Sequence, residues 1–172
     1  MAEAAEAASG VDGGKFLTFL LQEEEYGLEI LKVREIMGLM DITTVPQTPN
    51  YVRGVINLRG QVIPVVDLRL KFGMKEGGDD KRTCIIVVAV GGTMMGIVVD
   101  TVSEVMDING ASIEQTPSFG TKLNTDYILG MGKVNNGVKI LLDIDKVLTS
   151  DDLVILEEIQ STNKQKNKTE VN

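Results

Sequence analysis

The chain has 172 residues, of which 43% are hydrophobic and 24% charged, as in a globular protein with one ordinary domain or two small halves. Its 25 acidic residues outnumber its 17 basic ones and give a net charge of -8, which disfavours nucleic acid and anionic lipid as partners. The sequence contains no His, which excludes serine triads, Cys–His pairs and histidine zinc sites.

The two ends of the chain differ in composition from the rest. Residues 1–14 are rich in Ala, Glu and Gly and lack the basic and apolar regions of a secretory signal, while residues 161–172 read STNKQKNKTEVN. We expect both ends to be disordered tails. The single Cys, Cys84, lies in an apolar run and is expected to be a small buried hydrophobe in a reducing, cytoplasmic compartment.

Runs of β-branched and other apolar residues predict short strands. The expected strands cover residues 16–21, 25–30, 62–66, 84–90, 94–99 and 138–142. The uncharged stretch 83–99 is interrupted by Gly91 and Gly92, so it predicts a hairpin rather than a membrane span. Helices are expected over 49–58, 68–72, 144–148 and, at the end, 151–160, whereas residues 33–37 fit either a strand or a helix.

The chain contains an internal repeat. Residues 26–37 align with residues 95–106 at a shift of 69, and further on Gly54 aligns with Gly130 and Asp67 with Asp143. The pattern indicates two copies, roughly 15–80 and 81–150, each with two hairpins. Short strands at this spacing favour a mainly β fold of small, closed β-barrels, which leave few exposed edges.

Three features of the repeat are candidates for function. Asp67 and Asp143 each precede a short helical pattern, and helix capping explains them better than paired acid–base chemistry. Asn57-Leu58-Arg59-Gly60 predicts a turn with Gly60 at positive φ and Arg59 in solvent. Residues 51–75 hold five basic residues and one acidic residue, a balance that suits a protein partner.

Apolar residues also occupy equivalent places in the two copies. They pack in the core or line a groove between the halves that fits a partner helix. These residues are Val33, Ile36, Val102 and Val105.

Seven blocks between about residue 15 and 160 match one known pattern. They are Phe16-Leu17, Glu25–Leu28, Val33–Ile36, Tyr51–Gly60, Val62–Arg69, Gly96–Val105 and Tyr127–Gly130. Together they resemble the CheW family of coupling proteins in bacterial chemotaxis, and they include the pattern that this family shares with the regulatory domain of the histidine kinase CheA.

The resemblance implies two interleaved, five-stranded, SH3-like barrels and a non-catalytic adaptor without cofactor or metal. Such an adaptor binds the cytoplasmic tip of methyl-accepting chemoreceptors and the regulatory domain of CheA, in arrays or rings at the inner membrane face. Carried over by resemblance, the receptor-binding residues are Val33, Glu35, Ile36, Gly54, Arg59, Val102 and Val105. The kinase-binding residues are Ile63, Thr83, Cys84 and Phe119.

The resemblance also implies the free adaptor, because the chain shows no kinase catalytic segment and no room for a receiver domain after residue 160. Two other function classes stay open. A small β-barrel can bind single-stranded nucleic acid, although the negative charge and the 4% aromatic content oppose this. An enzyme relying on carboxylates alone is opposed by the capping interpretation of Asp67 and Asp143.

Overall fold

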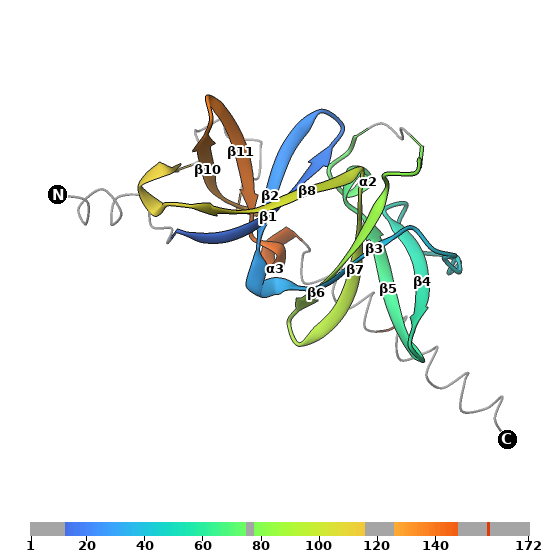
Figure 1. Ribbon diagram of the computed structural model, residues 1–172. Helices are drawn as coiled ribbons and strands as arrows, with labels where there is room; N and C mark the ends of the chain where they lie inside the picture. Colours follow the sequence, from blue (N-terminus) through green and yellow to red (C-terminus); the bar gives the residue numbers. More distant parts are fainter. Residues whose placement is uncertain (1–12, 75–77, 116–125, 148–157, 159–172) are drawn as a thin grey trace, which may run out of the picture. The chain divides into compact units, whose positions relative to one another are not determined.

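The computed structural model describes residues 13–74, 78–115, 126–147 and 158, and strands dominate them (Figure 1). The strands are β1 (Gly14–Leu21), β2 (Glu24–Glu29), β3 (Val33–Gly38), β4 (Val52–Leu58), β5 (Gln61–Asp67), β6 (Cys84–Val90), β7 (Thr93–Val99), β8 (Thr101–Ile108), β9 (Ile113–Glu114), β10 (Ile128–Val134) and β11 (Gly137–Leu142). The helices are α2 (Leu68–Lys71), α3 (Ile144–Val147) and the 3-10 turns η1 (Ile30–Lys32) and η2 (Gly110–Ser112). Among the residues that the structure describes, no helix has the length and apolar character needed to cross a membrane.

The chain divides into two compact units. The described part of the first unit comprises residues 13–33, 100–115 and 126–147, and that of the second unit comprises residues 34–74, 78–99 and 158. One sheet has the strand order β8-β1-β2-β11-β10-β9 and the other β3-β6-β7-β5-β4. The predicted fold class is therefore confirmed: the chain is mainly β with a few short helices, and in place of the two expected five-stranded barrels it has one sheet of six strands and one of five.

Each sheet combines hairpins from both copies of the internal repeat. The first sheet takes β1–β2 from the first copy and β10–β11 from the second, joined by the parallel pairing of β2 with β11. The second sheet takes β6–β7 from the second copy and β4–β5 from the first, joined by the parallel pairing of β5 with β7. Each sheet is therefore built from both copies: two of its six strands come from the first copy in the first sheet, and two of its five strands come from the second copy in the second sheet.

The repeat is reproduced down to single pairings. In the first sheet Leu141 lies opposite Gly27, and in the second Val65 lies opposite Gly96 at the equivalent position. The bridge of Thr43 with Val55 in the second unit corresponds to the β9–β10 pairing of the first.

Each unit buries its own apolar cluster. The cluster of the first unit is formed by Phe16, Ile108, Ile113 and Leu141. The cluster of the second unit is formed by Ile56, Ile63, Val65, Ile85, Val87 and Val98. Burying such a side chain stabilises the fold by about 1.5–3 kcal/mol, so these clusters fix which strands lie side by side.

The helix expected over residues 49–58 is wrong, because most of this segment forms β4. Its β-branched residues, among them Val52 and Val55, favour a strand paired with β5. Gly54 has a φ of 139°, which no helix accepts, and a Cβ there would lie 2.0 Å from the carbonyl oxygen of Thr43. Tertiary pairing around this glycine therefore outweighs the local helical pattern.

The other local predictions agree with the structure where it describes them. All six expected strands form, residues 33–37 belong to a strand, and the short helices after Asp67 and Asp143 appear as α2 and α3. The hairpin turn at Gly91 and Gly92 has φ values of 56° and 80°. Of the expected tails, only Gly13 and Gly14 lie among the described residues, and β1 begins at Gly14. Of the helix expected over 151–160, only Glu158 lies among them.

Candidate functional site

An exposed ion pair joins two of the residues assigned to receptor binding. Arg59, in the turn between β4 and β5, donates from both terminal nitrogens to the carboxylate of Glu35 on β3, one contact being 3.1 Å. The side chains are 72% and 31% exposed. The hydrogen bonds from Arg59 lower the pKa of the Glu35 carboxyl, and Glu35 in turn raises the pKa of Arg59. The pair is thus charged across the physiological range and accessible to a partner.

The backbone at this turn is unusual for an arginine. Arg59 has a φ of 51° and Gly60 a φ of 85°, and the Gly60 amide donates to the side chain of Asn57 at 2.8 Å. The predicted turn is therefore confirmed, with Arg59 also in the left-handed region. Residues other than Gly, Asn and Asp seldom adopt that region, and such positions concentrate at functional sites.

The apolar residues assigned to the receptor surface are partly accessible within their own strands. On β3, Val33 is half-buried and Ile36 is 43% exposed. On β8, Val102 is half-buried and Val105 is 48% exposed. Gly54, by contrast, is buried and shapes the backbone of β4 beside Thr43.

Two of the residues assigned to kinase binding are buried. Ile63 is fully buried in the core of the second unit, so its side chain offers no surface, unlike that of its exposed neighbour Gln61. Thr83 is 2% exposed, and its hydroxyl accepts a hydrogen bond from the Asp80 amide at 2.8 Å. Both residues therefore position the backbone of the region assigned to the kinase.

The remaining two kinase-assigned residues differ from each other. Cys84 is half-buried, and its thiol donates to the Arg82 carbonyl oxygen at 3.1 Å, so the expectation of a fully buried cysteine is wrong. The reason is its place as the first residue of β6, at the edge of the buried run. Phe119 lies outside the described residues.

The basic residues of segment 51–75 are largely paired inside the second unit. Arg69 is 5% exposed in its side chain and donates to Asp67 and to Asp79 at 2.8 and 2.9 Å. Arg53 contacts the same two carboxylates at 3.2 and 2.9 Å. We call these four residues the arginine–aspartate network. The sequence did not predict this network. Arg53 and Arg69 were counted among the basic residues facing a partner, but they pair with Asp67 and with Asp79, which lies before β6.

The network lowers the pKa of Asp79, chiefly through the hydrogen bond from Arg53 and then that from Arg69. Asp67 also accepts a hydrogen bond from the Arg69 amide at 3.0 Å, and Asp143 accepts one from the Asp145 amide at 3.1 Å. The capping role predicted for Asp67 and Asp143 is therefore confirmed, and the two residues belong to different units.

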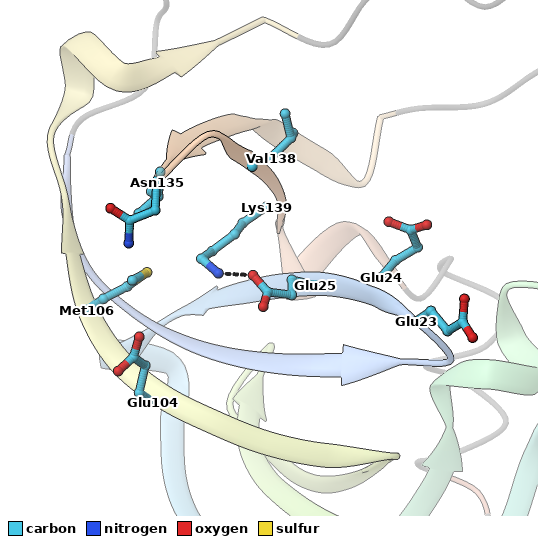
Figure 2. A pocket seen from close by; sticks show the side chains of 10 residues that line it. Glu23, Glu24, Glu25, Glu104, Met106, Asn135, Val138 and Lys139 are labelled. Carbon is cyan, nitrogen blue, oxygen red and sulfur yellow. Dashed lines mark hydrogen bonds and ion pairs between the residues drawn. The ribbon is translucent and has the colours of Figure 1, made fainter.

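The first unit contains an open hollow of about 480 Å³, shown in Figure 2, which we call the acidic hollow. It is lined by Glu23, Glu24, Glu25, Glu104, Met106, Val134, Asn135, Gly137, Val138 and Lys139. The ammonium of Lys139 pairs with the carboxylate of Glu25, as the dashed line in Figure 2 marks. These side chains include no nucleophile beside a base, and their negative charge opposes an anionic ligand.

Within the described part of the chain, no three His, Cys, Asp or Glu side chains gather in a group that could hold a metal ion. The chemistry that the assigned residues offer is that of binding rather than catalysis. The second unit offers the charged pair Glu35–Arg59 and the exposed Ile36, and the first unit offers the accessible Val102 and Val105 on β8.

Comparisons with known proteins agree on one family. The family model described as the CheW-like domain matches residues 15–152. The chain is 38% identical over 159 residues to "Chemotaxis protein CheW" of Klebsiella aerogenes, covering 92% of this chain and 96% of that protein. It is 32% identical over 140 residues to "Chemotaxis protein CheW" of Bacillus subtilis, covering 81% and 89%.

A solved structure agrees with these sequence matches. The crystal structure of the scaffolding protein TtCheW from Thermoanaerobacter tengcongensis is similar with a TM-score of 0.74 and 36% identity. The match covers 81% of this chain and 95% of that one.

Proposed function

The chain belongs to the CheW-like family of chemotaxis scaffold proteins, which are not enzymes, and on that premise we propose that it couples methyl-accepting chemoreceptors to CheA by binding both at once. The residues that we assign to the receptor tip are Glu35, Ile36 and Arg59 in the second unit and Val33, Val102 and Val105 in the first. The regulatory domain of CheA binds near β5 and the start of β6. In this role the protein works at receptor arrays on the inner membrane face.

The observation that carries the proposal is the Glu35–Arg59 pair. Surface ion pairs of this kind contribute little to stability, about 0–1 kcal/mol, and Arg59 holds its place in a backbone region that arginine seldom adopts. A residue kept in an unfavourable conformation with its charge in solvent is better explained by a partner than by the fold. Ile36 is also exposed, but as the next residue of β3 it offers its apolar side chain on the opposite face of the strand from Glu35.

The proposal for the kinase surface is supported by hydrogen bonds that hold residues 78–83, just before β6. Arg69 donates to the Gly78 carbonyl oxygen at 3.1 Å, and the Arg82 amide donates to Asp80 at 2.7 Å. A surface that is rigid before binding loses less conformational entropy when a partner docks. The proposed kinase contact therefore uses the exposed backbone and side chains that Ile63 and Thr83 hold in place.

The proposal is tested with purified components. A soluble chemoreceptor signalling fragment and the regulatory domain of CheA are titrated separately, and then together, against wild type and Glu35→Lys. We expect wild type to bind both at once and Glu35→Lys to lose the receptor at least about tenfold, because the reversed charge repels Arg59 and its partner site, while keeping the kinase domain.

The matched control is Glu114→Lys. This change also reverses the charge of a glutamate in a surface ion pair. Glu114 lies on β9, pairs with Lys133, and has a side chain that is 63% exposed. It should leave both affinities unchanged. Equal losses in the two variants would mean that overall charge, and not the Glu35–Arg59 pair, governs binding; no binding by wild type would refute the coupling function.

A further inference from the structure

One irregularity interrupts the pairing of β8 with β1, and it lies at Thr18. Leu17 pairs with Val105 and Phe19 pairs with Val102, with a shift of register between the two pairs. Thr18 therefore stands opposite two residues of β8. This count of one residue against two is that of a β-bulge.

The bulge decides which way the two valines of β8 face. Residues three apart in a regular strand point to opposite faces, since side chains alternate. Val102 and Val105 are three apart, yet they pair with Phe19 and Leu17, which are two apart and share a face of β1. Because directly opposed residues of paired strands lie on the same face, the bulge brings both valines to one face of β8.

The other face of β8 is turned toward the acidic hollow. Glu104 and Met106 both line that hollow, and Figure 2 shows their side chains along β8 at its border. Met106 also packs against the core cluster of the first unit. Without the bulge, the pairing on one side of Thr18 would shift by one residue, and one of the two valines would turn to the face of Glu104 and Met106.

The side chain of Thr18 holds the bulge in place. Its hydroxyl donates to the carbonyl oxygen of Glu104 at 2.8 Å and accepts from the amide of the same residue at 3.1 Å. Thr18 is completely buried, whereas Glu104 is exposed, so both bonds are partly shielded from water. The equivalent residue of the second unit is Val87, which has no hydroxyl. This arrangement thus belongs to the first unit and not to the repeat as such.

We propose that Thr18 is a positioning residue for partner binding: its hydroxyl fixes the bulge at Glu104 and so keeps Val102 and Val105 on one face. The inference rests on the proposed function in one respect, namely that this face forms part of the receptor-binding surface. Thr18 itself contacts no partner, because it is buried.

The test compares Thr18→Val, which keeps the shape and removes the hydroxyl, with Thr18→Ser, which keeps the hydroxyl. Ile113→Val, which removes one buried methylene from the core of the same unit, controls for a general loss of stability. Each folded variant is titrated with the soluble receptor fragment. We expect Thr18→Val to bind about tenfold more weakly and the other two within about twofold of wild type. Wild-type affinity in Thr18→Val, or equal weakening by Thr18→Ser, overturns the proposal.

Hydrogen exchange at the Glu104 amide tests the positioning independently of any receptor. Exchange should be at least about tenfold faster in Thr18→Val and unchanged in Thr18→Ser, because only the valine removes the acceptor of that amide. Equal rates in all chains contradict the role of Thr18, whereas a wild-type chain that binds no receptor fragment contradicts the proposed function. If Thr18→Val does not fold, Thr18→Ser must still keep both the Glu104 protection and the affinity of wild type; loss of either overturns the proposal.

Discussion

Asp67 in the second unit and Asp143 in the first occupy equivalent positions but differ in what surrounds them. Each accepts a hydrogen bond from the backbone amide two residues further on, at 3.0 and 3.1 Å. The amide of each also donates to a tyrosine carbonyl oxygen, that of Tyr51 at 2.7 Å and that of Tyr127 at 2.8 Å. The local role of the aspartate is thus the same in both units.

The tertiary surroundings separate the two aspartates. Asp67 is 3% exposed in its side chain and binds Arg69 and Arg53 in the arginine–aspartate network. The residues equivalent to these arginines are Asp145 and Leu129, and Asp143 itself is half-buried. In the first unit Asp145 instead forms a surface pair with Lys32 at 2.8 Å. The capping role therefore occurs in both copies, because the local sequence is repeated. The buried ionic network occurs only where the copy has Arg53 and Arg69 at these two positions.

The largest expected effect follows from removing the two charges. Asp67→Asn keeps a capping side chain but leaves the buried Arg69 with less compensating charge, so we expect a loss of about 3–5 kcal/mol in the free energy of unfolding. Asp143→Asn should cost less than about 1 kcal/mol, because asparagine caps as well as aspartate. Urea unfolding of both variants measures the difference. Equal losses would mean that capping, not the network, makes Asp67 important.

Asp79 offers a second and smaller test of the network. It bridges Arg53 and Arg69 from the loop before β6, and Asp79→Asn should reduce the free energy of unfolding at neutral pH by about 1.5–3 kcal/mol through weakened charge-assisted hydrogen bonds. The pKa of Asp79 is lowered in the fold from its ordinary value of 3.8. Its contribution is therefore complete above that pH and is lost as the pH falls through the lower, folded pKa.

The pH dependence of stability separates this effect from a simple loss of packing. As the pH falls below the ordinary carboxyl value of 3.8, wild type should lose the Asp79 contribution while Asp79→Asn has none to lose, so the two unfolding curves converge. Unfolding followed by circular dichroism at several pH values measures this. A difference in the free energy of unfolding that does not shrink as the pH is lowered would show that the charge of Asp79 is not the source of its effect.

The sequence predicted those features that depend on local patterns. Alternating apolar runs predicted the strands, Gly91-Gly92 the hairpin, and the aspartates the starts of α2 and α3. The helix expected over 49–58 was wrong because the conformation of Gly54 is imposed by Thr43, a contact that no local pattern encodes. The repeat itself did not predict the exchange of hairpins between the sheets, since the aligned copies match equally well whether they fold apart or together.

The candidate site was predicted unevenly for the same reason. Arg59 was expected in an exposed turn, and it is, but its pairing with Glu35 depends on bringing β3 beside the β4–β5 turn. The burial of Ile63 and Thr83 could not be read from residue type alone. A signal for the arginine–aspartate network was present in the sequence, because Arg53 and Arg69 are replaced at equivalent positions of the second copy.

The smallest expected effect on stability concerns the equivalent turns Arg59-Gly60 and Asn135-Asn136, which share the left-handed backbone with φ values of 51° and 85°, and 50° and 65°. Asparagine tolerates this region better than arginine, so Arg59→Asn should change the free energy of unfolding by no more than about 0.5 kcal/mol even though it removes a surface ion pair. The affinity of Arg59→Asn for the receptor fragment should nevertheless fall at least about tenfold, because the positive charge is gone.

The reverse change, Asn135→Arg, should lower the free energy of unfolding by a few tenths of a kcal/mol, because arginine is less suited than asparagine to the left-handed backbone. It should not affect receptor binding. Urea unfolding and titration of both variants measure the two effects separately. A loss of more than about 1 kcal/mol in Arg59→Asn would make Arg59 a structural residue and would remove the strongest support for the proposed receptor surface.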